Sequence, residues 1–431
     1  MYALQRELKL NKVETSLLRG NAGFKRWVYN YGLDLIQASW DFAGIQDSDA
    51  KRIDAIKKVF TQVTMRKTEN VWMKKYPSTV YQSAFIDLKK AFARWREGLS
   101  GFPVKKSKKK GDSFTVYKTA GIYPAKGQPP IPFTNRVVIS PGKRIKLPGL
   151  KEFRLKERID FCCSSQTFTV SRTADKWFVS FVLDAEKVPP IIHPIERIGV
   201  DLGVKSLATC SDGSKYDMPA TTKKAKTKLG KLQWRNRNKT LGRGSNTKKL
   251  NQPYNNEYPT TPTDQQTKAG SISRGQCVGS NKLKIKASKN ARKFYNKLAC
   301  QHARIANIRQ DTTQKMTTDL SRKAYTIRIE DLNVSGMVAN HKLANAVSNN
   351  CFYEIRRQLV YKQSHYGTKV ELVDRWYPSS KKCSRCNHVQ PMKLSDRVFQ
   401  CQNSQCGHIQ DRDENAAVNL EFAPLDKVRL A

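Results

Sequence analysis

Apolar residues recur at steps of three and four along two segments near the N-terminus. The first series is Phe24, Trp27, Val28, Tyr31 and Leu35, and the second is Val80, Ala84, Leu88, Phe92 and Trp95. This spacing places the apolar side chains on one face of an α-helix. We therefore predict two core-forming helices after one short strand, with Gly101 and Pro103 ending the second helix.

From about residue 113 to 188 the pattern changes to short β-rich runs separated by turns. The clearest runs are FTVY, RVVIS, RIKLPGL, TFTVS and KWFVSFVLD. Short strands at regular spacing are typical of a small barrel or sandwich. The segment KVPPIIHPIE (187–196) contains three prolines and predicts a linker into a second domain.

In the second half of the chain, predicted strands alternate with predicted helices. The segment RIGVDLGVKSLATCSDG predicts a buried strand, a tight turn at Gly203, a second strand and a further turn. Helical pattern returns up to Lys323, and YTIRIEDL, a helix around Ile355 and KVELV follow. This alternation indicates an α/β layer. Residues 240–282 are polar and lack hydrophobic periodicity, which predicts a mobile insertion.

Charge narrows the class of partner. The chain has 431 residues, with 79 Lys and Arg against 36 Asp and Glu, a formal net charge of +43. A hydrophobic content of 39% is sufficient for folded cores, and the length predicts two to four domains. Basic runs such as VKKSKKKG favour nucleic acid over a membrane surface. We see no signal peptide and no apolar run of about 18 residues, so we expect a soluble cytoplasmic protein.

Four of the ten cysteines form two pairs near the C-terminus: Cys383, Cys386, Cys401 and Cys406. Gaps of two and four residues, joined by a short loop, suit four thiolates around one tetrahedral Zn²⁺. His388 and His408 each follow a cysteine by two residues and are alternative ligands. A site closed by four protein ligands is structural, so we do not expect this zinc to be catalytic. Ordinary reduced cysteines are the alternative.

Three acids stand at places where a carboxylate needs a partner. Asp201 ends the first strand of the α/β region, Glu330 ends another strand, and Asp413 lies in the first turn of a predicted helix. A buried carboxylate is costly unless it is paired or binds a cation. Three converging acids would suit two Mg²⁺ ions about 4 Å apart, as in hydrolases of phosphodiesters.

The spacing of these acids alone is also compatible with purely structural roles. Asp201 can bond to backbone amides in the turn that follows it. Glu330 stands beside Asp331, and only one of two successive strand residues can face a shared site. Asp411 and Glu414 have the spacing of a helix capping box, which needs no metal and leaves Asp413 free to turn inward.

Several motifs, in order, resemble one family. They resemble motifs of the TnpB family, whose members are encoded by bacterial insertion sequences and are relatives of the compact type V CRISPR effectors. The motifs are GVDLGVKSLAT, IEDLNVSGM, DRWYPSSKKCSRC and CGHIQDRDENAAVNL. The resemblance is strong over 198–420. It is looser before that range, where GFPVKKSKKKGDSF and KLPGL match family elements.

The resemblance implies a multidomain α+β fold. An N-terminal β-barrel with a helical insertion precedes a RuvC-like α/β nuclease domain of RNase H fold, which a zinc ribbon interrupts. The implied domains are the first strand of a wedge-like barrel (1–12), a helical recognition domain (13–101), the rest of the barrel (102–190), the RuvC-like domain (191–380, with 240–282 as a flexible insertion), the ribbon (381–410) and a last RuvC segment (411–431).

The resemblance also implies an activity and its residues. Asp201, Glu330 and Asp413 would be the catalytic carboxylates and Mg²⁺ ligands; Asp413 is the acid two residues before Asn415, as in the family motif. The four paired cysteines would bind one structural Zn²⁺. Family members use a transposon-derived guide RNA to cut double-stranded target DNA beside a short motif, so base pairing reads the sequence. In the bacterial cell such a protein is expected on the nucleoid.

This sequence departs from the family pattern in three places. The second cysteine pair is separated by four residues instead of the usual two, and Asn387 replaces a usual Gly. The insertion at 240–282 splits a basic helical pair. Two alternative functions remain: a guide-RNA-dependent repressor that binds DNA without cutting, and a transposase that joins strands. The intact set of three acids argues against the repressor, and the ribbon between the last two acids argues against the transposase.

Overall fold

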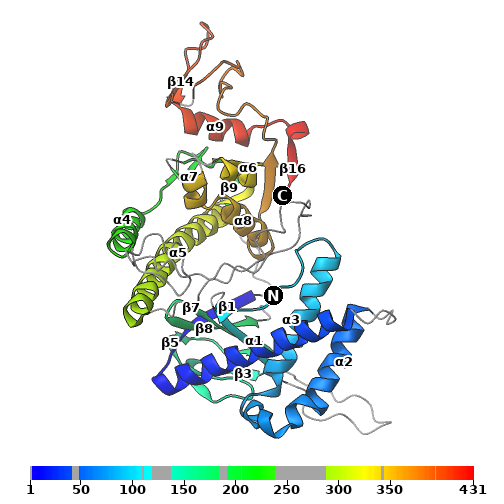
Figure 1. Ribbon diagram of the computed structural model, residues 1–431. Coiled ribbons are helices and arrows are strands. Elements are labelled where there is room, and N and C mark those ends of the chain that lie inside the picture. Colours follow the sequence, from blue (N-terminus) through cyan, green and yellow to red (C-terminus); the bar gives the residue numbers. More distant parts are fainter. Residues whose placement is uncertain are drawn as a thin grey trace, which may run out of the picture. The chain divides into compact units, whose positions relative to one another are not determined.

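The computed structural model describes residues 2–40, 48–108, 111–118, 137–183, 192–204, 206–237, 288–340, 344–393 and 395–431. The predicted insertion at 240–282 lies outside these residues. The chain divides into two compact units, Met1–Ile191 and Ile192–Ala431 (Figure 1).

The N-terminal unit combines helices with a β-sheet. Its elements are β1 (Tyr2–Lys9), α1 (Lys12–Trp40), α2 (Asp49–Gln62), the 3₁₀ turns η1 (Thr64–Arg66) and η2 (Thr68–Lys75), α3 (Ser78–Arg96), β2 (Asp112–Tyr117), β3 (Val137–Ile139), β4 (Gly142–Lys146), β5 (Glu152–Ile159), β6 (Cys163–Ser165), β7 (Thr167–Thr173) and β8 (Lys176–Leu183). The two predicted helices are confirmed as α1 and α3, which pack together through buried residues such as Val28 and Leu88.

The six-stranded sheet of this unit has the order β2-β7-β8-β1-β5-β4. The first strand of the chain, β1, is central and pairs with both β8 and β5. Closure into a barrel requires two neighbours for every strand. The edge strands β2 and β4 each have one, and β3 pairs separately with β6. In the described residues the sheet is therefore open, and the β-barrel expected from the sequence is not seen.

The C-terminal unit is an α/β layer followed by a cysteine-rich segment. Its elements are β9 (Ile195–Asp201), β10 (Ala208–Cys210), β11 (Lys215–Tyr216), α4 (Ala220–Arg235), α5 (Lys289–Lys323), β12 (Ala324–Glu330), α6 (Val334–Ala339), α7 (Ala344–Asn350), α8 (Phe352–Tyr366), β13 (Lys369–Val373), β14 (Val398–Gln400), β15 (Ile409–Asp411), α9 (Arg412–Glu421), the 3₁₀ turn η6 (Leu425–Lys427) and β16 (Val428–Leu430). The alternation of strands and helices predicted from the sequence is confirmed.

The sheet of this unit has the order β11-β10-β9-β12-β13-β16. β9, β12 and β13 run parallel, whereas β10 and β11 extend the sheet as an antiparallel meander and β16 is antiparallel to β13. Because successive strand residues face opposite sides, Ile198 and Val200 contribute to a core shared with α5 and α8. The other side of the sheet is covered by α9.

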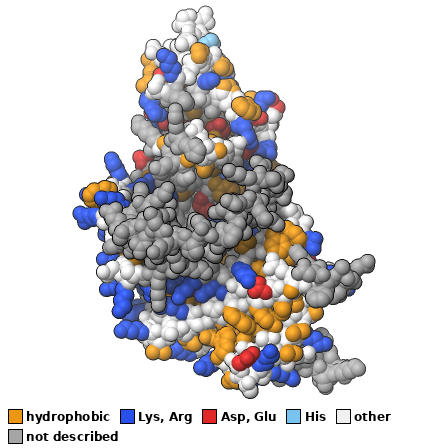
Figure 2. Space-filling model, viewed as in Figure 1, with side chains coloured by type: hydrophobic (Ala, Val, Ile, Leu, Met, Phe, Trp, Pro, Cys, Tyr) orange, Lys and Arg blue, Asp and Glu red, His pale blue; other side chains and the backbone are white. Residues whose placement is uncertain are grey.

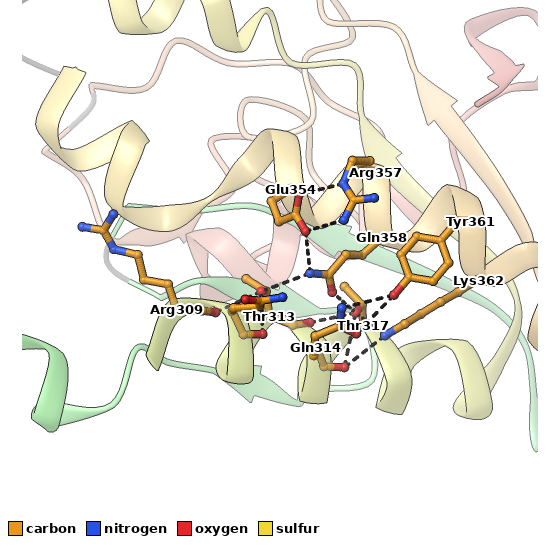
Figure 3. Close-up of polar contacts among 10 residues, drawn as sticks. Arg309, Thr313, Gln314, Thr317, Glu354, Arg357, Gln358, Tyr361 and Lys362 are labelled. Carbon is orange, nitrogen blue, oxygen red and sulfur yellow. Dashed lines mark hydrogen bonds and ion pairs between the residues drawn. The ribbon is translucent and has the colours of Figure 1, made fainter. Parts of the chain in front are cut away.

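The helices α5 and α8 also share a buried polar contact (Figure 3). Gln358 accepts a hydrogen bond from the Thr317 hydroxyl at 2.8 Å and donates one to Glu354 at 2.9 Å. Lys362 is 3% exposed, and its ammonium donates to the Thr317 and Thr318 hydroxyls. Burial, with the charge of Arg322, lowers the pKa of Lys362 to about 8. These specific bonds fix how the two helices align.

Lys and Arg side chains are spread over the described surface on the face drawn in Figure 2, where acidic side chains are fewer. This distribution agrees with the net charge of +43. Among the helices that the structure describes, none has both the length and the apolar character needed to cross a membrane.

Candidate functional site

Two of the predicted acids end neighbouring parallel strands. In the register of β9 and β12, Val200 is paired with Ile329. The next residue on each strand is the acid, Asp201 on β9 and Glu330 on β12. Equal register in parallel strands places both side chains on the same side of the sheet. The two carboxylates therefore lie next to each other where the strands end.

The third acid is brought in by close packing of α9 on β9. A Cβ atom on Gly199 would lie 2.0 Å from the Ala417 carbonyl oxygen and 2.5 Å from the Glu421 amide nitrogen. The backbone of α9 therefore rests directly on the strand, which only glycine permits. Asp201 follows Gly199 by two residues and faces the same side, and Asp413 precedes Ala417 by one helical turn. This packing directs Asp413 towards Asp201.

A buried arginine holds the other end of α9. Arg328, 2% exposed, points to the α9 side of β12, as Glu330 does. Its guanidinium donates to the carbonyl oxygens of Glu421 and Ala423, both at 2.8 Å, and to the Glu371 carboxylate at 2.8 Å. Carbonyl groups at the end of a helix lack partners within the helix, and a cation there stabilises it. Arg328 therefore fixes α9 on the sheet that carries the other two acids.

Burial and mutual repulsion perturb the clustered carboxyls. Burial, followed by the charges of Asp413 and Glu330, raises the pKa of Asp201 to about 7. Burial, with a contribution from Asp331, raises the pKa of Glu330 to about 7. Both shifts express the cost of gathering negative charge in a poorly solvated place. A bound cation would remove that cost.

The neighbouring acids Asp411 and Glu414 have other partners. The Asp411 carboxylate caps α9 by accepting hydrogen bonds from the backbone amides of Asp413 and Glu414, at 3.0 and 3.3 Å. The predicted Asp411 cap is thus confirmed, whereas the Glu414 half of the predicted capping box is replaced by an ion pair with Lys215. The Lys215 ammonium lies 2.8 Å from Glu414 and 3.7 Å from Asp411. Capping and Lys215 together account for these two acids and leave Asp413 for the cluster.

Asp331 also has a separate, structural role. Its carboxylate is 9% exposed and forms ion pairs with Arg356, Arg375 and Arg429, at 2.8, 3.1 and 2.5 Å. Burial opposes ionisation, but the hydrogen bonds from Arg429 and Arg375 outweigh it and lower the pKa of Asp331. Adjacent acids at the end of β12 therefore face different surroundings, as the alternation of strand side chains requires.

This contrast predicts opposite effects of two isosteric substitutions. Glu330 has a raised pKa, so its ionisation costs the folded state stability as the pH rises from about 4.5 to about 7. At pH 8, in buffer free of Mg²⁺, Glu330→Gln should leave the melting temperature equal or higher. Asp331→Asn leaves three arginines without their acceptor and should cost about 2 kcal/mol, or about 5 °C. Scanning calorimetry of both variants checks this, and a fall in melting temperature for Glu330→Gln would contradict the placement of Glu330.

The four paired cysteines meet in the cysteine-rich segment. Their sulfur atoms all lie within 4.8 Å of one another. Those of Cys383 and Cys406 are 3.8 Å apart, and those of Cys386 and Cys401 are 3.6 Å apart. Tetrahedral Zn²⁺ with bonds of about 2.3 Å places thiolates about 3.8 Å apart, so the donor set fits zinc. Within the described residues these four form the one group of three or more Cys, His, Asp or Glu side chains that could hold a metal ion as they are placed.

The two departures from the family pattern that involve the cysteine pairs are accommodated by local geometry. Asn387 has φ of +63° and Gly407, at the equivalent place in the second pair, has φ of +57°. Asn is one of the few residues other than Gly that tolerate this left-handed conformation. The longer second pair closes the same way as the first, because Cys383 donates its amide to the His388 carbonyl and Cys401 donates to that of His408, both at 2.8 Å.

The two alternative histidine ligands lie outside the sulfur cluster. The His408 Nε2 atom forms hydrogen bonds with Ser384 Oγ and Gln410 Oε1, at 3.2 and 3.1 Å. His388 acts through its backbone: its amide bonds to the Cys386 sulfur and lowers the pKa of that thiol, whereas burial raises the pKa of the Cys401 thiol. The packing of the four sulfur atoms, which includes neither histidine, therefore favours four sulfur ligands.

Sequence reasoning did not identify the residues that position the acids. Gly199 and Arg328 hold α9, and Lys215 neutralises its capping acids. Arg328 was visible as a charge between two isoleucines in TIRIED, two residues before Glu330. Asn415 served only as a marker of the family motif. The partners of these side chains are distant in sequence, so their roles depend on the fold.

Comparison with known proteins identifies the proteins that this chain resembles. A model of the Cas12f1-like TNB domain matches residues 352–420, a range that contains all four clustered cysteines and most of α9. A Streptomyces pristinaespiralis protein named "Putative RNA-guided DNA endonuclease" is 28% identical over 406 residues, covering 94% of this chain and 84% of that protein. The TnpB-like protein L79 of Acanthamoeba polyphaga mimivirus is 32% identical over 139 residues, 31% of this chain and 26% of that protein.

The chain is TnpB-like and related to Cas12f. Among solved structures, this TnpB-like chain resembles Cas12f1 in its complex with sgRNA and target DNA. The TM-score is 0.51 at 15% sequence identity, with 96% of this chain and 83% of that chain covered. At so low an identity the likeness concerns the fold, which supports a mixed α+β architecture.

Proposed function

We propose that this TnpB-like chain is an RNA-guided, Mg²⁺-dependent DNA endonuclease that cuts through Asp201, Glu330 and Asp413. One observation carries the proposal: three acids from distant parts of a TnpB-like sequence converge where β9 and β12 end and α9 begins. The Streptomyces pristinaespiralis relative, which is matched over 94% of this chain, is named "Putative RNA-guided DNA endonuclease".

The sheet supports the RuvC-like, RNase H fold that the resemblance implies. A three-stranded antiparallel meander, β11-β10-β9, is extended by the parallel strands β12 and β13. In open α/β sheets, functional groups gather where the parallel strands end. Asp201 and Glu330 stand there, and α9 supplies the third acid to the same place.

The residues that would hold Mg²⁺ are the same three acids. Carboxylate oxygens are the ligands that Mg²⁺ prefers, and a cation would offset the burial and the neighbouring negative charges that raise the pKa of Asp201. When bound, Mg²⁺ supplies activation of water and stabilisation of charge on the leaving oxygen. The protein contributes the fixed placement of the acids, through Gly199 and Arg328.

For the cysteine cluster we propose one structural Zn²⁺ bound by Cys383, Cys386, Cys401 and Cys406, which makes 381–410 a zinc ribbon. Four protein ligands leave no open position for chemistry. The sulfur spacing supports this assignment.

The proposed partners are a guide RNA and a double-stranded target DNA. The Cas12f1 chain of similar fold was solved with both kinds of nucleic acid. A net charge of +43 suits a protein that holds two polyanionic backbones while base pairing reads the sequence. We propose that the helices within 13–101 contribute to this binding.

The experiment that tests the proposed function begins with bound RNA. The protein is purified from cells carrying its native locus, and the RNA that remains bound is sequenced. We expect one dominant species that ends in a short variable segment, and Mg²⁺-dependent cutting of DNA matching that segment. Heterogeneous cellular RNA would contradict guided action. Guided binding of DNA without cutting in Mg²⁺ would favour the repressor alternative.

A further inference from the structure

One buried amide joins the cysteine cluster to the helix that carries Asp413. Asn415, in α9, has 0% exposure. Its Nδ2 donates to the Lys382 carbonyl at 2.8 Å, and its Oδ1 accepts from the Ser384 amide at 3.0 Å. Lys382 and Ser384 are the residues on either side of Cys383. The side chain of Asn415 thus binds both peptide groups that flank one of the four clustered cysteines.

A second buried amide reinforces this contact. Asn419 lies one helical turn after Asn415 and is 4% exposed. It donates to the carbonyl oxygens of Ser379 and Lys382, at 2.8 and 2.6 Å. The Lys382 carbonyl therefore accepts from both asparagines. The two bonded carbonyls and the Ser384 amide all belong to the turn around Cys383 (379–384), and that turn is held against α9.

The same helix is fixed at the acid cluster. Asp413 precedes Asn415 by two residues, and α9 rests on β9 at Gly199, next to Asp201. A displacement of the turn at Cys383 would therefore leave Asn415 with unsatisfied buried groups or move the first turn of α9 with it. Either outcome is costly, because buried amides need their hydrogen bonds.

We propose that Asn415 is a positioning residue that couples the cysteine cluster to the acid cluster. Zinc on the four cysteines fixes the turn at Cys383, Asn415 transmits that order to α9, and α9 sets the place of Asp413. This inference rests on the proposed function for the identity of the two metals. It goes beyond that function in making zinc occupancy a determinant of divalent-cation binding at the acids.

Coupling between two sites is reciprocal. If zinc strengthens the binding of Mg²⁺ at the acids, then Mg²⁺ must stabilise zinc at the cysteines by the same factor. This gives a readout that does not depend on DNA cleavage: the extent of zinc release from the full chain at equilibrium with a fixed concentration of a zinc-selective colorimetric chelator, with and without Mg²⁺.

In the wild type we expect Mg²⁺ to raise the affinity for zinc by about fivefold or more, which is measured as less zinc release at equilibrium. Asn415→Ala should remove this effect of Mg²⁺, although the variant still binds one zinc. Asn415→Asp, which keeps the size of the side chain but cannot donate to the Lys382 carbonyl, should remove it as well. Asp413→Asn should also remove it, because the acid site itself is altered.

The matched control is Gln358→Ala. Gln358 is a buried amide of the same unit, with 0% exposure, but it joins α8 to α5 on the other side of the sheet. Its loss should lower thermal stability and leave the Mg²⁺ effect on zinc release as in the wild type. If Asn415→Ala acted only by destabilising the fold, Gln358→Ala would weaken the Mg²⁺ effect on zinc release to the same extent.

Two results would overturn the proposal: an Mg²⁺ effect that survives in both Asn415 variants, or a wild type that cuts DNA but shows no effect of Mg²⁺ on zinc release. In the second case guided cleavage stands, so the proposed function survives and only the coupling fails. Absence of guided cleavage, found in the test above, would instead remove the proposed function.

Discussion

Asp413→Asn should reduce the rate of guided DNA cleavage by about 10³-fold, which corresponds to about 4 kcal/mol of lost transition-state stabilisation. The amide keeps the volume of the side chain, and the backbone bond from residue 413 to the Asp411 cap is untouched. The substitution therefore removes one carboxylate without unwinding α9. Affinity for the guide RNA and for the target DNA should stay within about twofold of the wild type. Single-turnover cleavage and filter-binding assays measure the two quantities.

Glu414→Gln is the matched control for that substitution. Glu414 lies next to Asp413 in the first turn of α9, but its carboxylate pairs with Lys215 at 2.8 Å. Loss of a partly exposed ion pair costs at most about 1 kcal/mol, so the cleavage rate should fall no more than about fivefold. Equal losses for the two variants would show that the whole turn matters and not the carboxylate of Asp413. A cleavage rate for Asp413→Asn equal to that of the wild type would contradict the assignment of Asp413 to the catalytic site.

Cys383→Ser should remove the bound zinc and destabilise the C-terminal unit by several kcal/mol, with a fall in its melting temperature of about 10 °C. The Cys383 side chain is fully buried, and the turn that carries it is held by two buried asparagines of α9. Loss of the metal should therefore disorder the cysteine-rich segment and also remove its packing against α9. Elemental analysis and scanning calorimetry give the zinc content and the transition.

Cys300→Ser is the control, because Cys300 lies on α5, outside the sulfur cluster. It should retain one zinc per chain and melt close to the wild type. A Cys383→Ser protein that keeps its zinc and its melting temperature would contradict the four-cysteine site.

Features encoded by nearby residues could be predicted from the sequence. The apolar series in α1 and α3, the strands of the N-terminal unit, the Asp411 cap and the cysteine pairs each depend on neighbours within a few residues to about two dozen. The pairing of strands depends instead on residues that are far apart in the sequence. The central position of β1 and the edge positions of β2 and β4 result from contacts across much of the N-terminal unit, and the expected barrel is not seen in the described residues.

The site formed by the three acids could be predicted only in part from the sequence. Their spacing left metal binding and structural roles open, and the family resemblance selected them. Their convergence depends on the register of β9 with β12 and on Gly199, where α9 meets the strand. No local pattern reports that a glycine in a buried strand admits a helix backbone. Likewise, the distant partners of Asn415 at Lys382 and Ser384 appear only in the fold. The catalytic role of the acids stays a prediction.

The most direct test of the central claim is cleavage by the full chain loaded with a guide RNA of chosen sequence. In Mg²⁺, two DNAs are compared that differ only in the segment paired with the guide, each flanked by a randomised stretch so that any required adjacent motif is represented. We predict that only the matched DNA is cut, and that exchanging the guide exchanges the DNA that is cut. Cutting of both DNAs at the same rate, or of neither while the guide remains bound, would contradict the account.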